Sequence, residues 1–357
     1  MLYLCFTCDH ELFFGKNYLF EEEVLISPTC RLLDVLESNN VKATLFTDVC
    51  SVLRYKQLGL NEYPAKIETQ LRTSLQRGHD VQLHIHPHWL KSEYINGCWN
   101  FDASGYQLQS FGFEGSNQRY PDAGEIIKSS KEYLEALLGD VDPNYRCIAY
   151  RAGGLCLQPE KELLLSLKKN GIAIDSSVIK GGYVNTNLIK YNYLDTPESV
   201  NWWMSPKTGA RVAVRPDTAH DIFEIPIGSY YKKPLVWLIS HRNVPMIDSK
   251  PSGIGMPFLK MESKLAKRLR GYRYAVVPLS LDFYCSAVLI EVLKNIMKEN
   301  DCVSKDCYLS IICHPKGLKE AHLNNIDTFI KKVTGTFPEI RFATMRDIFD
   351  RIAKKST

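Results

Sequence analysis

The sequence predicts an α/β fold in which helices surround a parallel sheet or barrel. Short apolar runs alternate with helical patterns through most of the 357 residues, as they do in βαβ units. Ionisable residues follow these runs repeatedly, and in a barrel the carboxyl ends of the strands share one face, which carries the site. The strand-end residues are Asp9, Glu11, His84, His88, Arg151, Asp175 and His314.

The first strand is predicted at Leu2 to Cys8. This continuous apolar run is typical of a strand buried on both faces, and it ends in Asp9-His10-Glu11. Three ionisable side chains at such an end are costly unless they are paired, coordinated or solvated. The elements that follow are a helix over 31–37, a strand over 41–47, a helix over 61–77 and a strand over 81–85.

The second half of the chain continues the alternation. Helices are predicted over 124–138, 159–169 and 281–298, and strands over 146–150, 171–174, 222–227, 308–313 and 341–343. Arg151 ends the first of these strands, and His314 ends the strand over 308–313. The length allows one large barrel or two modest domains.

Three of the nine histidines, His84, His86 and His88, lie within five residues at the end of a predicted strand. Imidazole is a common ligand of Zn²⁺, so the cluster indicates a metal site. Two ligand pairs are open. His84 and His86 share a face if the strand runs on, whereas His84 and His88 converge if the chain turns at Pro87. The cluster alone names no reaction.

Composition and charge narrow the class of protein. A net charge of +4 is too small to indicate nucleic acid as a partner. The 11 cysteines are scattered, which favours buried, reduced thiols. Met1 leads into an apolar strand without a basic region before it or a cleavage site after it, and no apolar run reaches 18 residues. We therefore expect a soluble, cytoplasmic protein.

Two segments interrupt the alternation. Residues 91–120 are rich in Gly, Ser, Asn and aromatics, so they either offer aromatic rings to sugars or fold over their own apolar cluster. Residues 232–275 hold an apolar stretch and then a basic run. A basic amphipathic helix there would lie on an anionic membrane surface, and the alternative is a solvated helix face.

The order of these motifs resembles the polysaccharide deacetylase family, the NodB-homology carbohydrate esterases. The motifs that carry the resemblance are Thr7 to Glu11, His84-x-x-x-His88, Tyr150 to Gly154, and His314. The resemblance implies a single domain, 1–357, folded as a distorted (β/α)₇ barrel with insertions at about 91–120 and 232–275. It is imperfect, because the Arg-x-Pro-Tyr of the family is Arg151-Ala152-Gly153-Gly154 here.

The resemblance also implies a divalent metal, in the first place Zn²⁺. His84 and His88 would be ligands, with Glu11 as the carboxylate ligand and His10 as its rival. Many members have Asp-Asp in the first motif, where this chain has Asp9-His10. Asp9 and Glu11 share one face of a strand, which fits an Asp-x-Glu variant of the motif.

Three residues receive catalytic roles from the resemblance. Asp9 would be the general base that takes a proton from water, and Arg151 would pair with Asp9 and orient it. His314 would protonate the leaving amine from across the site. We expect hydrolysis of an N-acetyl or O-acetyl group on a saccharide, which could be lipid-linked, in cell-surface glycan biosynthesis. The alternatives are an amidohydrolase for a small non-sugar amide and a barrel that binds a glycan without cutting it.

Overall fold

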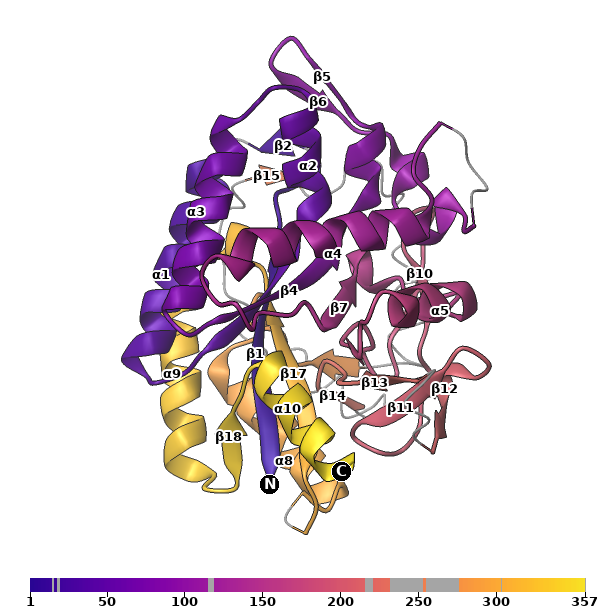
Figure 1. Ribbon diagram of the computed structural model, residues 1–357. Coiled ribbons are helices and arrows are strands. Elements are labelled where there is room, and N and C mark those ends of the chain that lie inside the picture. Colours follow the sequence, from indigo (N-terminus) through magenta and orange to yellow (C-terminus); the bar gives the residue numbers. More distant parts are fainter. Residues whose placement is uncertain are drawn as a thin grey trace, which may run out of the picture.

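The computed structural model describes residues 1–14, 16–17, 20–114, 119–215, 221–231, 253–254, 276–302 and 304–356. Its centre is one curled sheet surrounded by helices (Figure 1). The parallel strands, in spatial order, are β13 (Ile222–Glu224), β8 (Ile174–Asp175), β7 (Ala149–Ala152), β4 (Asp80–Ile85), β3 (Ala43–Asp48), β1 (Leu2–His10) and β17 (Cys307–Cys313). The predicted α/β class is confirmed.

The two ends of this parallel array approach each other. Ile227, just beyond β13, bridges Ser310 of β17, and the backbone N–H of Gly228 donates to the carbonyl of Ser310 at 2.9 Å. The curled sheet therefore has the form of a distorted barrel, as predicted. Beyond β13 the sheet continues antiparallel through β11 (Trp202–Ser205) and β12 (Gly209–Val214), while β18 (Ile340–Phe342) pairs with β1.

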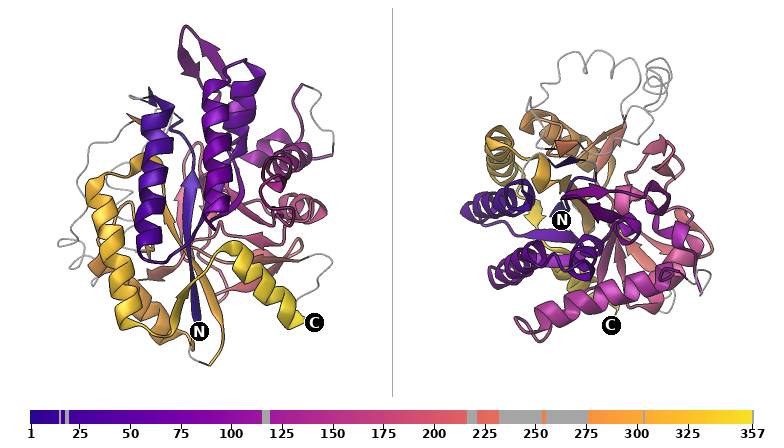
Figure 2. Two further views of the ribbon diagram at one scale, coloured as in Figure 1. Left: turned by 60° about the vertical axis from the view of Figure 1, so that its left-hand side comes forward. Right: turned by 90° about the horizontal axis from the view of Figure 1, so that it is seen from above.

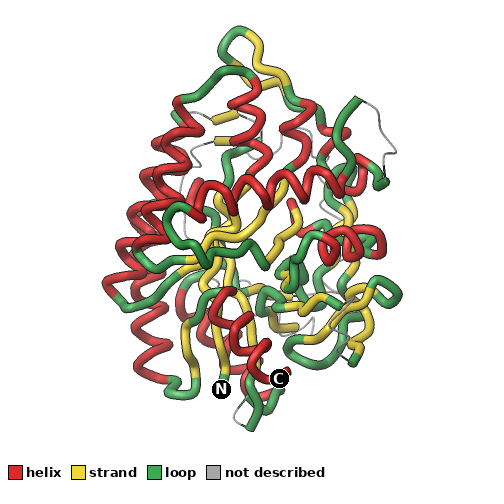
Figure 3. Tube along the Cα trace, viewed as in Figure 1, coloured by secondary structure: helices red, strands yellow, loops and turns green. Residues whose placement is uncertain are grey.

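Helices cover the outer face of the sheet, as the tube in Figure 3 shows. They are α1 (Ser27–Ser38), α2 (Val49–Gln57), α3 (Glu62–Gln76), α4 (Ala123–Gly139), α5 (Lys161–Lys169), α8 (Ser286–Glu299), α9 (Glu320–Thr336) and α10 (Met345–Ser356). Viewed from above, the helices lie along one side of the strands and below them in an arc (Figure 2). In the described part of the chain, no helix is long and apolar enough to cross a bilayer.

Alternation along β1 separates two apolar clusters. Leu2, Leu4 and Phe6 point outward and pack in the large cluster beneath the helices. Tyr3 and Cys5 point inward and join a smaller cluster that Met345 of α10 closes at the amino ends of the strands. Because side chains on a strand alternate between faces, Thr7 and Asp9 continue the inward row. The barrel interior is thus apolar at one end and polar at the other.

The described part of the segment at 91–120 folds mostly over its own aromatic cluster, although Tyr94 in its hairpin is exposed. It forms the hairpin β5 (Glu93–Ile95) and β6 (Cys98–Asn100), at the top of Figure 1, and the short 3₁₀ turns η3 (Ala103–Gly105) and η4 (Leu108–Phe111). Phe101, Tyr106 and Phe111 are all buried. The segment at 232–275, with its predicted basic run, lies outside the described residues except for β15 (Gly253–Ile254). β15 pairs with β2 (Lys16–Asn17).

Candidate active site

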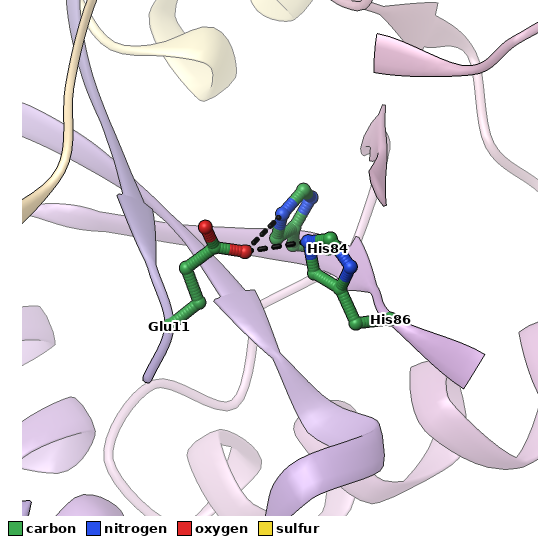
Figure 4. A group of neighbouring side chains, drawn as sticks. All are labelled: Glu11, His84 and His86. Atoms are coloured by element: carbon green, nitrogen blue, oxygen red, sulfur yellow. Dashed lines mark hydrogen bonds and ion pairs between the residues drawn. The ribbon is translucent and has the colours of Figure 1, made fainter. Parts of the chain in front are cut away.

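A group of three buried side chains stands at the carboxyl ends of β1 and β4. Glu11, His84 and His86 each offer one ligand atom, and these atoms lie within 4.8 Å of one another (Figure 4). Oε2 of Glu11 is 3.0 Å from Nε2 of His84 and 2.5 Å from Nε2 of His86. The three side chains are no more than 5% exposed. We call Glu11, His84 and His86 the trio.

The hydrogen bonds of His84 show why a cation fits the trio. Nδ1 of His84 lies 2.8 Å from the carbonyl oxygen of Arg151, which can only accept, so Nδ1 carries a proton. In a neutral ring the lone pair on Nε2 then faces the carboxylate of Glu11. Two acceptors face each other stably only if the ring is protonated or a cation lies between them. A histidine that donates one ring N–H to a carbonyl and offers the other nitrogen is the usual arrangement of a metal ligand.

Electrostatics keep Glu11 and His86 in the forms that bind a metal. Burial alone would lower the pKa of His84, but Glu11 and Asp9 outweigh burial and raise it, so a metal would have to displace a proton from this ring. Burial alone would raise the pKa of Glu11, but Lys316 and the neighbouring histidines outweigh it, so this pKa lies well below its usual value. Burial lowers the pKa of His86 to about 4. At neutral pH, Glu11 is therefore a carboxylate and His86 is a neutral imidazole, as metal ligation requires.

His86 rather than His88 completes the trio, which differs from the predicted ligand set. His86 directly follows β4, with φ −113° and ψ 83°, and its ring lies beside that of His84, with the ring centroids 4.7 Å apart. The N–H of His86 donates to Oδ1 of Asp48 at 3.0 Å, which fixes the chain there. Pro87 then begins a 3₁₀ turn, which leaves His88 outside the trio although its ring centroid stays 5.6 Å from that of His86. His88 packs against Tyr106 instead, with ring centroids 5.5 Å apart.

His10 lies on the opposite face of β1 from Asp9. Nε2 of His10 is 3.0 Å from Oε1 of Gln70 in α3, and Nδ1 is 3.5 Å from the hydroxyl of Thr47. The ring is therefore held among the helices. The structure thus places Glu11 of the first motif, and not His10, with the two histidines.

Arg151 and Asp9 form a fully buried ion pair beside the trio. Nη1 of Arg151 donates to Oδ1 of Asp9 at 2.6 Å and to the hydroxyl of Thr7 at 2.8 Å. The other side of the guanidinium donates to the carbonyl and hydroxyl oxygens of Ser176. Burial alone would raise the pKa of Asp9, but Arg151 and His84 outweigh it and lower the pKa. Asp9 is therefore a carboxylate with a fixed orientation, as predicted for its contact with Arg151.

His314 reaches the same place from the end of β17. Its Nε2 lies 3.6 Å from Oδ2 of Asp9, while its Nδ1 lies 2.7 Å from Oδ2 of Asp282. The backbone N–H of His314 donates to the other oxygen of Asp282 at 2.9 Å. Burial acts against a charged ring, but Asp282 and the site carboxylates outweigh it and raise the pKa of His314 to about 9. At neutral pH this ring holds a proton on Nε2, facing Asp9.

Two glycines of the third motif make room for side chains at the site. A Cβ on Gly153 would lie 2.5 Å from the carbonyl oxygen of Ile85 and 2.9 Å from the ring of His86. A Cβ on Gly154, whose φ is +59°, would lie 2.7 Å from the hydroxyl of Tyr106. The Arg-Ala-Gly-Gly sequence therefore accompanies His86 and the Tyr106 of the 91–120 segment.

Sequence reasoning missed Asp48, Asp282, Lys316 and Tyr106. Asp48 and Asp282 each follow a short apolar run, so the strand-end pattern used for Asp9 could have found them. Tyr106 lies in a segment without periodicity, and no local signal distinguishes it from the other aromatics there.

Comparison with solved structures shows the same fold over almost the whole chain. A protein assigned as a polysaccharide deacetylase, from Mycobacterium smegmatis, is 13% identical with a TM-score of 0.50, covering 99% of this chain and 91% of that one. A second protein with that assignment, from Pseudomonas aeruginosa PAO1, is 12% identical with a TM-score of 0.47, covering 97% and 89%. The Puue allantoinase is 12% identical with a TM-score of 0.48, covering 97% and 88%.

No family model matches the sequence, and no curated protein matches it significantly. The structural neighbours include polysaccharide deacetylases and an allantoinase, and also a 4-alpha-glucanotransferase and a GH57-type branching enzyme, all at low sequence identity. On the Mycobacterium smegmatis structure, with a TM-score of 0.50, the chain has the NodB-type fold of the polysaccharide deacetylases, as the order of its motifs predicted.

Proposed function

We propose that this protein is a metal-dependent deacetylase that hydrolyses an N-acetyl or O-acetyl group on a saccharide. One observation carries the proposal: a carboxylate and a protonated imidazole meet beside the trio, with Nε2 of His314 3.6 Å from Oδ2 of Asp9. Each is held by a partner of its own, Arg151 for Asp9 and Asp282 for His314. A base and an acid in contact with one small space are what hydrolysis of an acyl bond requires.

Each residue of the site has a separate role in the proposed reaction. The trio would hold a divalent cation, Zn²⁺ in the first place, which when bound polarises an acyl oxygen and lowers the pKa of water. Oδ2 of Asp9 accepts the proton of the attacking water, while Arg151 keeps Asp9 ionised and oriented. Nε2 of His314 gives its proton to the leaving nitrogen or oxygen. Asp282 fixes the tautomer of His314 and stabilises its charge.

A small non-sugar amide is the second candidate substrate. The trio is almost inaccessible, with Glu11 4% exposed and both histidines 1% exposed, and His314 is the more open member of the site, with its side chain 30% exposed. The low exposure of these residues suits a small acyl group on either substrate. Activity on N-acetylated sugars, compared with activity on small amides of similar size, distinguishes the two.

The setting of the reaction is part of the proposal. We propose that the protein acts in the cytoplasm on a saccharide of cell-surface glycan assembly, which could be lipid-linked, with peripheral membrane contact through the basic run of 232–275. Nucleic acid is not a proposed partner, since the net charge is only +4.

Metal content and turnover of a variant series test the proposal. About one equivalent of divalent metal is expected in the wild type. The metal should be lost in Glu11→Ala and His86→Ala and kept in His88→Ala and His10→Ala, the matched histidine controls. Asp9→Asn should keep the metal and lose turnover by at least about 10²-fold. Metal loss in His88→Ala with retention in His86→Ala would instead restore the ligand set expected from sequence. An Asp9→Asn variant with near-full activity would refute the role of Asp9 as base.

A further inference from the structure

Lys316 contacts the trio from the side opposite the histidines. It lies in the 3₁₀ turn η6 (Pro315–Gly317), two residues after His314. Its Nζ donates to Oε1 of Glu11 at 2.6 Å and to the carbonyl oxygen of Leu12 at 3.0 Å. The ammonium also lies 4.5 Å from the centre of the Phe14 ring, and the side chain is only 10% exposed. A half-buried lysine whose ammonium makes these contacts is held in one position.

The carboxylate of Glu11 is consequently divided between two sets of partners. Oε1 faces Lys316, whereas Oε2 faces both imidazoles, at 3.0 Å from His84 and 2.5 Å from His86. A carboxylate can bind a cation through one oxygen or through both. With an ammonium on Oε1, only Oε2 is directed at the point where the two histidines converge.

We propose that Lys316 is a positioning residue that makes Glu11 a one-oxygen ligand and so keeps a coordination position open for the reacting groups. This inference rests on the proposed metal site. Catalytic zinc sites have three protein ligands and an open fourth position, whereas a carboxylate that binds through both oxygens fills one position more. Lys316 prevents that second contact by holding Oε1.

The charge of Lys316 has a second effect, on metal affinity. Partners outside the ligand sphere usually accept a hydrogen bond from a ligand, raise its basicity and strengthen metal binding. Lys316 does the opposite, because it donates to the ligand and places a positive charge beside the cation. Lys316 should therefore weaken metal binding while it keeps one coordination position open. His314 and Lys316 come from one turn after β17, so the same backbone segment sets the proton donor and the ligand geometry.

Cobalt binding to four forms of the protein tests this inference. The forms are the wild type, Lys316→Met, Lys316→Gln and the control Lys331→Met, which breaks an exposed lysine–carboxylate pair, Lys331 with Asp327 at 2.7 Å. Each is titrated with Co²⁺ against a competing chelator, and its visible spectrum is recorded. Four-coordinate Co²⁺ absorbs more strongly, and at longer wavelength, than five- or six-coordinate Co²⁺.

The expected results separate geometry from charge. In Lys316→Met both oxygens of Glu11 become available, so the Co²⁺ absorption should weaken and the affinity should rise about tenfold. Lys316→Gln keeps an N–H donor for Oε1 without the charge, so it should retain the wild-type spectrum and still bind more tightly. Lys331→Met should match the wild type in both respects. If Lys316→Met fails to fold, the affinity of Lys316→Gln remains the test.

Two outcomes would overturn different claims. A wild type that binds no Co²⁺ and no Zn²⁺ refutes the metal site, and with it the proposed function. A wild type that binds Co²⁺, with Lys316→Met and Lys316→Gln unchanged in spectrum and within about twofold in affinity, refutes only the role of Lys316.

Discussion

Replacing Arg151 by Met would leave the carboxylate of Asp9 buried without its partner. The guanidinium is fully buried, Asp9 is only 3% exposed, and Nη1 of Arg151 lies 2.6 Å from Oδ1 of Asp9, so the pair is largely shielded from bulk water. Met fills much of the same volume, so that packing changes less than charge does. The substitution therefore combines the cost of an unpaired buried charge with the loss of the hydrogen bonds to Thr7 and Ser176.

The expected loss of stability is about 3–5 kcal/mol, the usual cost of removing one partner of a buried ion pair. Total stabilities of about 5–15 kcal/mol make this a large fraction of the whole. Urea denaturation at pH 7, followed by circular dichroism, measures it. The matched control is Arg77→Met, which breaks the pairs of a partly exposed arginine with Asp34 at 2.6 Å and Glu37 at 2.8 Å. That substitution should cost no more than about 1 kcal/mol.

The double variant Asp9→Asn with Arg151→Met completes the test. Because it removes both charges, it should be more stable than the sum of the two single effects predicts, by at least about 1 kcal/mol. The defect of Arg151→Met should also shrink as the pH is lowered. Without Arg151 the pKa of the buried Asp9 rises above its unfolded value, so the folded state takes up the proton first. Single effects that add to within about 0.5 kcal/mol would refute the coupling of the pair.

Three further predictions concern the rest of the site and one distant histidine. Gly153→Ala should cost about 1–3 kcal/mol and weaken metal binding, because the new methyl group would displace the ring of His86; an unchanged melting temperature and metal content would contradict this. Asp282→Asn should lower the pKa of His314 from about 9, and so move the alkaline limb of the pH–rate profile to lower pH; a limb that stays in place would exclude His314 as the acid. His79 accepts the N–H of Ala43 on Nδ1 at 3.0 Å, and burial lowers its pKa to about 4, so it is neutral when folded. The neutral His79 ring stabilises the folded state fully above the unfolded pKa of about 6.5, and this stabilisation is lost as the pH falls towards 4, by about 2 kcal/mol at pH 5. Urea denaturation at pH 7.5 and at pH 5 should show this loss of unfolding free energy in the wild type and not in His79→Gln.

The sequence predicted the strands and their terminal residues correctly wherever a buried strand was a continuous apolar run. The apolar run Leu2 to Cys8 and the run before His314 became β1 and β17, and their terminal residues meet at one site. Period-two alternation, applied to Asp9 and Glu11, also placed them on the face that the structure shows. These inferences depend only on local geometry, which the residues of a strand determine among themselves.

The choice between His86 and His88 could not be made from local geometry. It depends on whether the extended conformation ends at Ile85 or one residue later, and boundaries are the least certain part of a sequence-based assignment. Asp48 decides it by binding the N–H of His86, and Asp48 belongs to another strand. Lys316 likewise meets Glu11 only through the pairing of β1 with β17, about 300 residues apart in sequence.

The alternation along β1 makes the chemistry of the site sensitive to insertions and deletions. One extra residue between Phe6 and Thr7 would exchange the two faces of the strand end, bringing the ring of His10 inward and turning Asp9 towards Gln70 and the helices. Thr7 and Asp9 would lose Arg151 in the same step. Length changes in this strand should therefore be tolerated only in pairs of residues or when a β-bulge absorbs them. A screen of one- and two-residue insertions in β1, scored by the amount of folded protein, would test this expectation.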